Sequence, residues 1–171
     1  MNSAQKTVAI GAACGIATMV LLLAGLSVVI PQPPGDLSVA DRLAFALKWD
    51  LLAVVPLLLM LTRVADGRFR SDAINPLAQR ETRAQLIDGR VTRNTLEQYV
   101  LFLVGSLSLS TLLAPQYLPV LPAACVVFVL ARLAFWLGYH RDPLYRAPGM
   151  AATLFLNFGI LGSAMVTAML R

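Results

Sequence analysis

The chain has 171 residues, of which 58% are hydrophobic and 13% are charged, and its mean hydropathy is +0.72. This composition lies far outside the range of soluble globular domains and indicates an integral membrane protein. The net charge is +5, but no DNA- or RNA-binding motif accompanies it. We therefore expect no nucleic acid partner.

Five apolar stretches are each close to the ~20 residues that an α-helix needs to cross the hydrocarbon core of a bilayer. The sequence therefore predicts an all-α protein that spans the membrane five times and contacts membrane lipids. In chain order the predicted spans are residues 7–30, 43–62, 94–113, 120–139 and 149–170.

The first stretch, residues 7–30, has a second interpretation as a cleavable signal peptide. Its apolar run of 24 residues is longer than an ordinary signal-peptide core, and no clear small-x-small cleavage site follows it. We therefore interpret it as a retained helix. The proline-rich segment "IPQPPGD", residues 30–36, ends this helix in an outer loop.

The second stretch contains polar residues whose role the sequence leaves open. Residues 51–62 alone would extend only about 18 Å, too short to cross the membrane, so the span has to include Lys48 and Asp50. Pro56 predicts a kink in it. Intramembrane charges also occur in small transporters, but no internal repeat or broken helix is visible in the sequence, so that class ranks last.

The basic residues predict the orientation, since Lys and Arg are retained on the cytoplasmic side of the membrane. With five spans, one face holds ten of the fourteen basic residues and the other holds only Arg42 and Arg171, while Lys48 and Arg132 lie within spans. Most of the ten lie in or beside the long connection of residues 63–93. We expect a multi-pass protein of a bacterial inner membrane with a cytoplasmic N-terminus.

The cysteines and the single histidine carry no predicted chemistry. Cys14 and Cys125 differ in predicted membrane depth by roughly 12 Å, whereas a disulfide needs Cα atoms within about 7 Å. We interpret both as buried apolar thiols. His140 has no Cys/His cluster around it, so no metal site is expected. Small residues in "GAACG", from Gly11, and "GILGSAM", from Gly159, predict close helix packing.

Two polar stripes lie near the cytoplasmic ends of the third and fourth stretches. Arg90, Asn94 and Glu97 are spaced i, i+4 and i+7, so they fall within about 60° of one another on one helix face. Arg132 and Tyr139 are seven residues apart and also share a face, with Phe135 or Trp136 between them and Arg146 just beyond the helix.

The two stripes are expected to meet. Glu97 lies roughly 5 Å and Arg132 roughly 10 Å below the cytoplasmic end of its helix, close enough for contact between neighbouring helices. A charge that faces lipid is costly, so we expect a buried Glu97–Arg132 ion pair that fixes helix register, or a functional role for both. With Arg90, Arg93 and Arg146, the set describes a pocket for a small polyanion at the membrane surface.

The motifs of these stripes resemble a known family. "RVTRNTLEQYVLF", from Arg90, resembles the second-helix signature of the MAPEG superfamily, the membrane-associated proteins in eicosanoid and glutathione metabolism. "ARLAFWLGYHRDPLYRAPG", from Ala131, is similar to its third-helix signature. The resemblance covers about residues 43–170. It implies a MAPEG-like four-helix transmembrane domain of residues 43–171, assembled as a homotrimer. Residues 1–42 would be one extra N-terminal transmembrane helix and an outer loop.

The resemblance also implies that glutathione, as co-substrate, binds in subunit clefts that face the cytosol. Arg146 would lie near the thiol as the catalytic residue. An arginine from the end of a neighbouring subunit's first family helix would contribute, and Arg63, Arg68 and Arg70 match it equally well. The remaining glutathione-binding residues would be Arg90, Asn94, Glu97, Arg132 and Tyr139.

Three departures from the family pattern bear on activity. Gln98 stands where the family's transferases have an aromatic residue, which is shifted here to Tyr99, and Phe135 stands where they often have Tyr or His. The extra helix reverses the N-terminus but leaves the pocket cytosolic. Two functions stay open. One is a glutathione-dependent transferase or lipid-hydroperoxide reductase that acts on lipophilic electrophiles. The other is a non-catalytic trimer that binds a lipid head group or a partner protein.

Overall fold

The computed structural model describes residues 1–35 and 37–170. Over this range the chain forms six α-helices and four short 3-10 helices, and no strand. The all-α prediction is therefore confirmed. The elements are α1 Ser3–Val29, α2 Val39–Ala53, α3 Val55–Phe69, η1 Asp72–Ile74, η2 Pro76–Ala78, α4 Arg83–Leu112, η3 Pro115–Tyr117, α5 Val120–Arg141, η4 Pro143–Arg146 and α6 Ala147–Met169.

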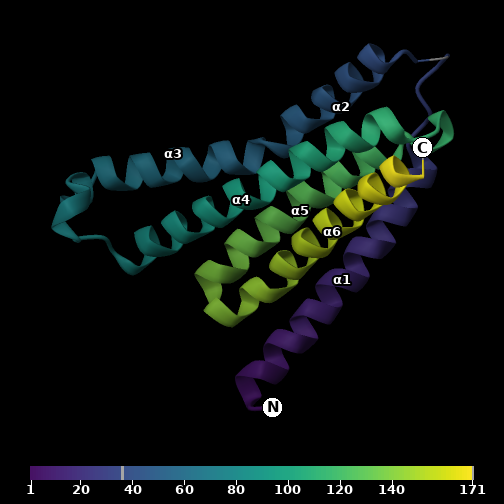
Figure 1. Ribbon diagram of the computed structural model, residues 1–171. Coiled ribbons are helices and arrows are strands. Elements are labelled where there is room, and N and C mark those ends of the chain that lie inside the picture. Colours follow the sequence, from purple (N-terminus) through teal and green to yellow (C-terminus); the bar gives the residue numbers. More distant parts are fainter. Residues whose placement is uncertain (36, 171) are drawn as a thin grey trace.

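The helices form one bundle in which α4, α5 and α6 lie side by side (Figure 1). The helices α2 and α3 cover α4, and α1 covers α6. The larger apolar core contains Phe102 and Phe128, whose ring centroids are 4.6 Å apart. A smaller core contains Met60, Val91 and Phe135. The polar stripes lie beside this second core.

Four segments are long and apolar enough to cross a membrane, counted over residues 1–35 and 37–170. They correspond to the first, second, fourth and fifth predicted spans. The third predicted span lies in α4, whose Glu97, Gln98 and Ser106 make it less apolar. The helix α4 nevertheless packs along α5 and α6. Its crossing of the membrane stays a prediction. The segments are Ser3–Val29, Val39–Phe69, Pro115–Arg141 and Pro143–Met169.

The second predicted span is two helices that meet at Val54. Pro56 has no backbone N–H to continue the hydrogen-bond pattern, so the predicted kink is a break between α2 and α3. The interpretation that no broken helix is present is corrected accordingly. Asp50, just before the break, is 2% exposed and neither of its carboxylate oxygens has a hydrogen-bond partner among the described residues, whereas Lys48 is exposed.

The helix α4 begins about eleven residues before the predicted span. Thr82 and Gln85 form a reciprocal cap, in which each side chain accepts a hydrogen bond from the other's backbone N–H. Gln85 Nε2 also donates to the Gly67 carbonyl and the Ser71 hydroxyl, at 2.7 and 2.8 Å. The ends of α3 and α4 are thus tied together, and Figure 1 shows both extending beyond α5 and α6.

The N-terminal helix packs through the small residues of its "GAACG" motif. A Cβ added at Gly15 would lie 2.1 Å from the Pro148 carbonyl oxygen, so only glycine allows this approach of α1 to α6. The packing prediction is confirmed here, but Gly159 faces open space within the single chain. Cys125 is buried, as predicted. The prediction for Cys14 is wrong, because Cys14 is exposed on α1, where only Gly15 and Met19 are buried.

Candidate functional site

Arg132 on α5 is the most deeply buried charged residue of the predicted site. Its side chain is fully buried. Nε and Nη2 donate to the Thr95 hydroxyl at 3.1 and 2.8 Å, and Nη2 also donates to Asn94 Oδ1 at 3.0 Å. Nη1 is buried without a hydrogen-bond partner among the described residues. The site therefore retains one unsatisfied cationic donor beside Asn94.

The predicted ion pair between Glu97 and Arg132 is not formed. Glu97 is exposed, and its carboxylate accepts a hydrogen bond from Asn94 Nδ2 at 3.5 Å. The reason is the direction of the side chains around α4. Thr95 faces α5, and Glu97, two residues further on, is rotated by about 200° from it. Glu97 is thus linked to Arg132 only through Asn94.

The stripe on α5 is continuous, as its spacing predicted. The Arg132 guanidinium lies 4.2 Å from the centre of the Phe135 ring, and Phe135 packs edge-on against Tyr139 at 5.8 Å. The Arg146 guanidinium lies 5.2 Å from the Tyr139 ring, and Arg146 Nη1 donates to the Pro143 carbonyl at 2.9 Å. Cation–π contacts hold both arginines against this aromatic pair.

Arg90 is exposed on α4 and lies apart from this series of contacts. It lines a cavity of about 560 Å³ between α3 and α4. Arg93 also lines it, and no ion pair is found for Arg90 or Arg93 among the described residues. The other lining residues are Val64, Arg68, Glu81, Gln85, Leu86, Gly89, Thr92 and Leu96. The cavity is therefore suited to an anionic group.

The three arginines near the end of α3 have different surroundings. Arg63 Nε is 3.7 Å from the Asp88 carboxylate, and Arg70 Nε is 2.6 Å from Asp66 on the same helix. Arg68 is 3.4 Å from Glu81 and lines the cavity together with Arg90 and Arg93. Of the three candidates, Arg68 is thus the one that lies beside predicted site residues in its own chain.

Gln98, the first departure from the family pattern, has a packing role. Its side chain is buried, and both its side-chain and main-chain oxygens accept hydrogen bonds from Asn157 Nδ2, at 2.9 and 3.0 Å. Gln98 therefore joins α4 to α6. Asn157 was not singled out from the sequence, because a lone polar residue in an apolar helix has no local partner that would draw attention to it.

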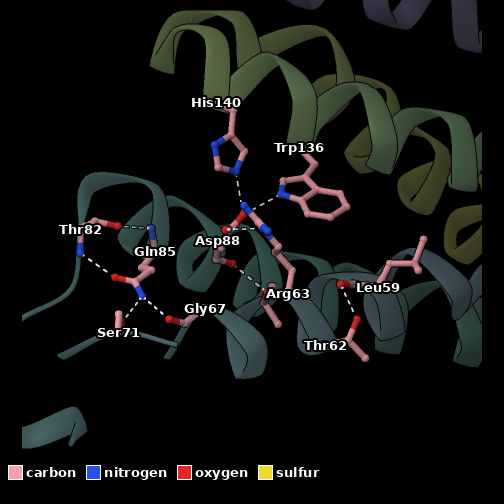
Figure 2. Close-up of polar contacts among 11 residues, drawn as sticks. Leu59, Thr62, Arg63, Gly67, Ser71, Thr82, Gln85, Asp88, Trp136 and His140 are labelled. Carbon is pink, nitrogen blue, oxygen red and sulfur yellow. Dashed lines mark hydrogen bonds and ion pairs between the residues drawn. The ribbon is translucent and has the colours of Figure 1, made fainter. Parts of the chain in front are cut away.

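A second polar cluster was missed. Asp88 is 3% exposed and contacts Trp136 and His140 of α5 and Arg63 of α3 (Figure 2). The sequence predicts a connection over residues 63–93, and a connection has no helical face on which Asp88 would be placed. The signal was present, because Asp88 and Thr95 share a face at i and i+7, and Trp136 and His140 share one at i and i+4.

Comparison with known proteins decides the family. The sequence model of the MAPEG family matches residues 46–166. The chain belongs to the MAPEG family. No curated protein and no solved structure matched in the corresponding searches. The matched residues begin in α2 and end in α6, so this MAPEG protein carries α1 outside the matched region.

The residues present fit glutathione, which the family implies. Glutathione has two carboxylates, one ammonium group and a thiol. Exposed Arg90 and Arg93 are donors for carboxylates, and exposed Glu97 is an acceptor for an ammonium group. No cluster of three or more His, Cys, Asp or Glu that could hold a metal occurs among residues 1–35 and 37–170.

Proposed function

We propose that this MAPEG protein is a membrane-embedded, glutathione-dependent enzyme, a transferase or lipid-hydroperoxide reductase that acts on lipophilic electrophiles. Family membership and the membrane helices support the class. The observation that carries the proposal is the unbroken series of contacts from Asn94 through Arg132, Phe135 and Tyr139 to Arg146. It connects Asn94 on α4 with the cationic Arg132 on α5 and Arg146 in η4.

In this proposal, glutathione lies on the exposed face of α4. Arg90 binds one of its carboxylates, and Glu97 binds its ammonium group. Arg132 is fully buried and contributes by holding Asn94 in place. Asn94 donates to the peptide backbone, and the Tyr139 hydroxyl adds a further hydrogen bond. Apolar walls between the helices admit an electrophile dissolved in the bilayer.

The chemistry requires a thiolate, because the thiolate and not the thiol is the nucleophile. Arg146 beside the sulfur lowers the thiol pKa through its positive charge. With an electrophilic carbon, the S–C bond forms and the leaving group departs with the bonding electrons. With a hydroperoxide, the sulfur attacks the distal oxygen, the O–O bond breaks, and the released alkoxide takes up a proton. A second glutathione thiolate then converts the sulfenic acid, with one proton, to disulfide and water.

A homotrimer is part of the proposal. The outward face of α4 carries Arg90, Arg93 and Glu97 together with the exposed Val100 and Val104. Charges that face acyl chains are costly, by about 2.5 kcal/mol or more at the helix centre, so a second copy covers this face. We propose that an arginine from the end of α3 of the neighbouring subunit, Arg63, Arg68 or Arg70, completes the site.

The experiment that tests the proposal is a titration of the detergent-solubilised protein with glutathione, followed by calorimetry and by thiolate absorbance near neutral pH. Binding together with a lowered thiol pKa supports an enzyme. Absence of binding at millimolar glutathione contradicts it.

The reaction would take place at the cytosolic face of a bacterial inner membrane.

A non-catalytic trimer is the second candidate. Two observations favour it: Gln98 is occupied by Asn157, and Phe135 stacks on Arg132 without any polar group to offer a ligand. In that case the arginine-lined cavity binds a lipid head group, or the α3–α4 hairpin binds a partner protein. Binding of glutathione without a lowered thiol pKa would leave this candidate in place.

A further inference from the structure

Asp88 joins three helices of the bundle (Figure 2). Its Oδ1 accepts a hydrogen bond from Trp136 Nε1 at 2.8 Å, and His140 Nε2 lies 2.6 Å from the same oxygen. Its Oδ2 lies 3.7 Å from Arg63 Nε. Asp88 belongs to α4, Trp136 and His140 to α5, and Arg63 to α3, so one carboxylate holds all three helices.

The burial of these side chains shows which contacts matter most. The Asp88 side chain is 5% exposed and the Arg63 side chain 59% exposed, so Arg63 is a peripheral partner of a buried anion. A buried carboxylate has to be hydrogen-bonded, because its desolvation is otherwise uncompensated. Trp136 and His140 satisfy one oxygen at short distances. Asp88 therefore holds the C-terminal end of α5, through Trp136 and His140, more tightly than it holds α3, through Arg63.

The segment that Asp88 holds is the one that carries the proposed catalytic residues. Trp136 and His140 lie on either side of Tyr139 in α5. Beyond them, η4 packs directly on α5, because a Cβ at Gly138 would lie 2.3 Å from the Tyr145 carbonyl oxygen. Arg146 follows Tyr145 in η4. A shift of the α5 end would therefore move Tyr139 and Arg146 relative to Asn94 on α4.

We propose that Asp88 is a positioning residue, which acts through Trp136 and His140 to place Tyr139 and Arg146 opposite the ligand-binding residues of α4. The expected effect on catalysis rests on the proposed function. The placement of the end of α5 by Asp88 does not depend on glutathione. Displacement of a catalytic group by about 1 Å can lower a rate roughly a hundredfold, so loss of the Asp88 contacts should affect kcat more than the KM for the electrophile.

The first test is hydrogen–deuterium exchange of the full-length protein in nanodiscs without glutathione. In Asp88→Ala, we expect the amides of residues 138–146 to exchange at least tenfold faster, while residues 120–131 keep their protection. Asp66→Asn is the matched control, since Asp66 pairs with Arg70 on its own helix at the same membrane side, and it should leave both segments unchanged. Unchanged exchange of residues 138–146 in Asp88→Ala would overturn the inference.

The second test separates positioning from a general loss of structure. Asp88→Asn keeps an acceptor for Trp136 but loses the charge, so we expect it to restore part of the protection and part of kcat that Asp88→Ala loses. If Asp88→Asn and Asp88→Ala lose kcat only in proportion to unfolded protein, the positioning role is excluded. If wild-type protein does not bind glutathione, the proposed function fails, and the exchange experiment alone decides whether Asp88 places the end of α5.

Discussion

Arg132 on α5 is held by Asn94 on α4, with Nη2 of the guanidinium 3.0 Å from the Asn94 side-chain oxygen. Thr95, the next residue, accepts two further hydrogen bonds from the same guanidinium. Arg132 is fully buried, and a buried guanidinium is costly unless its N–H groups are satisfied. These contacts therefore fix the alignment of α4 and α5.

Removal of the Thr95 hydroxyl should destabilise the bundle. Thr95→Val leaves two buried donor atoms of Arg132 without this acceptor, so we expect the free energy of unfolding to fall by about 1 to 3 kcal/mol. Denaturant unfolding in micelles measures the change. Thr92→Val is the matched control, because its hydroxyl bonds only to the Asp88 carbonyl within α4, and its effect should be smaller. Equal effects of the two variants would contradict this reading of Arg132.

Glu97 and Arg132 should show little energetic coupling, since they make no direct contact. In a double-mutant cycle of Glu97→Gln and Arg132→Gln, we expect a coupling free energy below about 0.5 kcal/mol. The cycle of Asn94→Ala and Arg132→Gln should give a clearly larger value, because those side chains are hydrogen-bonded. A large Glu97–Arg132 coupling would restore the ion pair that the sequence suggested.

Enlargement of Gly15 should displace α1 from α6. A Cβ at this position meets the Pro148 carbonyl at 2.1 Å, whereas one at Gly25 meets nothing within 4 Å. We expect Gly15→Leu to lower the free energy of unfolding by about 1 to 3 kcal/mol, whereas Gly25→Leu should not lower it, because it only replaces a glycine inside a helix. Thermal unfolding of both variants is the measurement. Similar values for the two would mean that α1 is not docked as described.

The orientation can be tested by cysteine labelling in a Cys14→Ala background. Arg80→Cys lies between α3 and α4 and should react with a membrane-impermeant reagent only after the inner membrane is permeabilised. Gln32→Cys lies between α1 and α2 and should react in intact spheroplasts. Both positions are exposed. The opposite labelling pattern would place the proposed site on the outer face.

Helical spacing predicted the stripe on α5 correctly because the spacing of Arg132, Phe135 and Tyr139 is a local property of one helix. The pairing between helices was predicted less well. Membrane depth alone suggested Glu97 as the partner of Arg132, but the direction of each side chain around α4 decides the contact, and that direction selects Thr95 and Asn94. A contact between two helices requires both a matching depth in the membrane and side chains that point toward each other around the helix axes.

The cluster around Asp88 shows a second limit. Its residues come from three helices, and charges between two apolar stretches look like a solvated loop. The reciprocal cap of Thr82 and Gln85 was readable as the start of a helix. With α4 extended to residue 83, Asp88 would have been placed on the same face as Thr95. The extent of α4 was thus available from the sequence, whereas its contacts with Trp136 and His140 required the fold.

The central claim is that Arg146 activates the thiol of bound glutathione, and the absorbance of the thiolate tests it most directly. In wild-type protein saturated with glutathione, we expect the thiol pKa to fall from about 8.5, the value of free cysteine, toward neutrality. Arg146→Ala should retain glutathione binding through Arg90, Asn94 and Glu97 but lose the thiolate absorbance and the conjugation rate. Binding without any thiolate signal in the wild type, or the same signal in Arg146→Ala, would contradict the account.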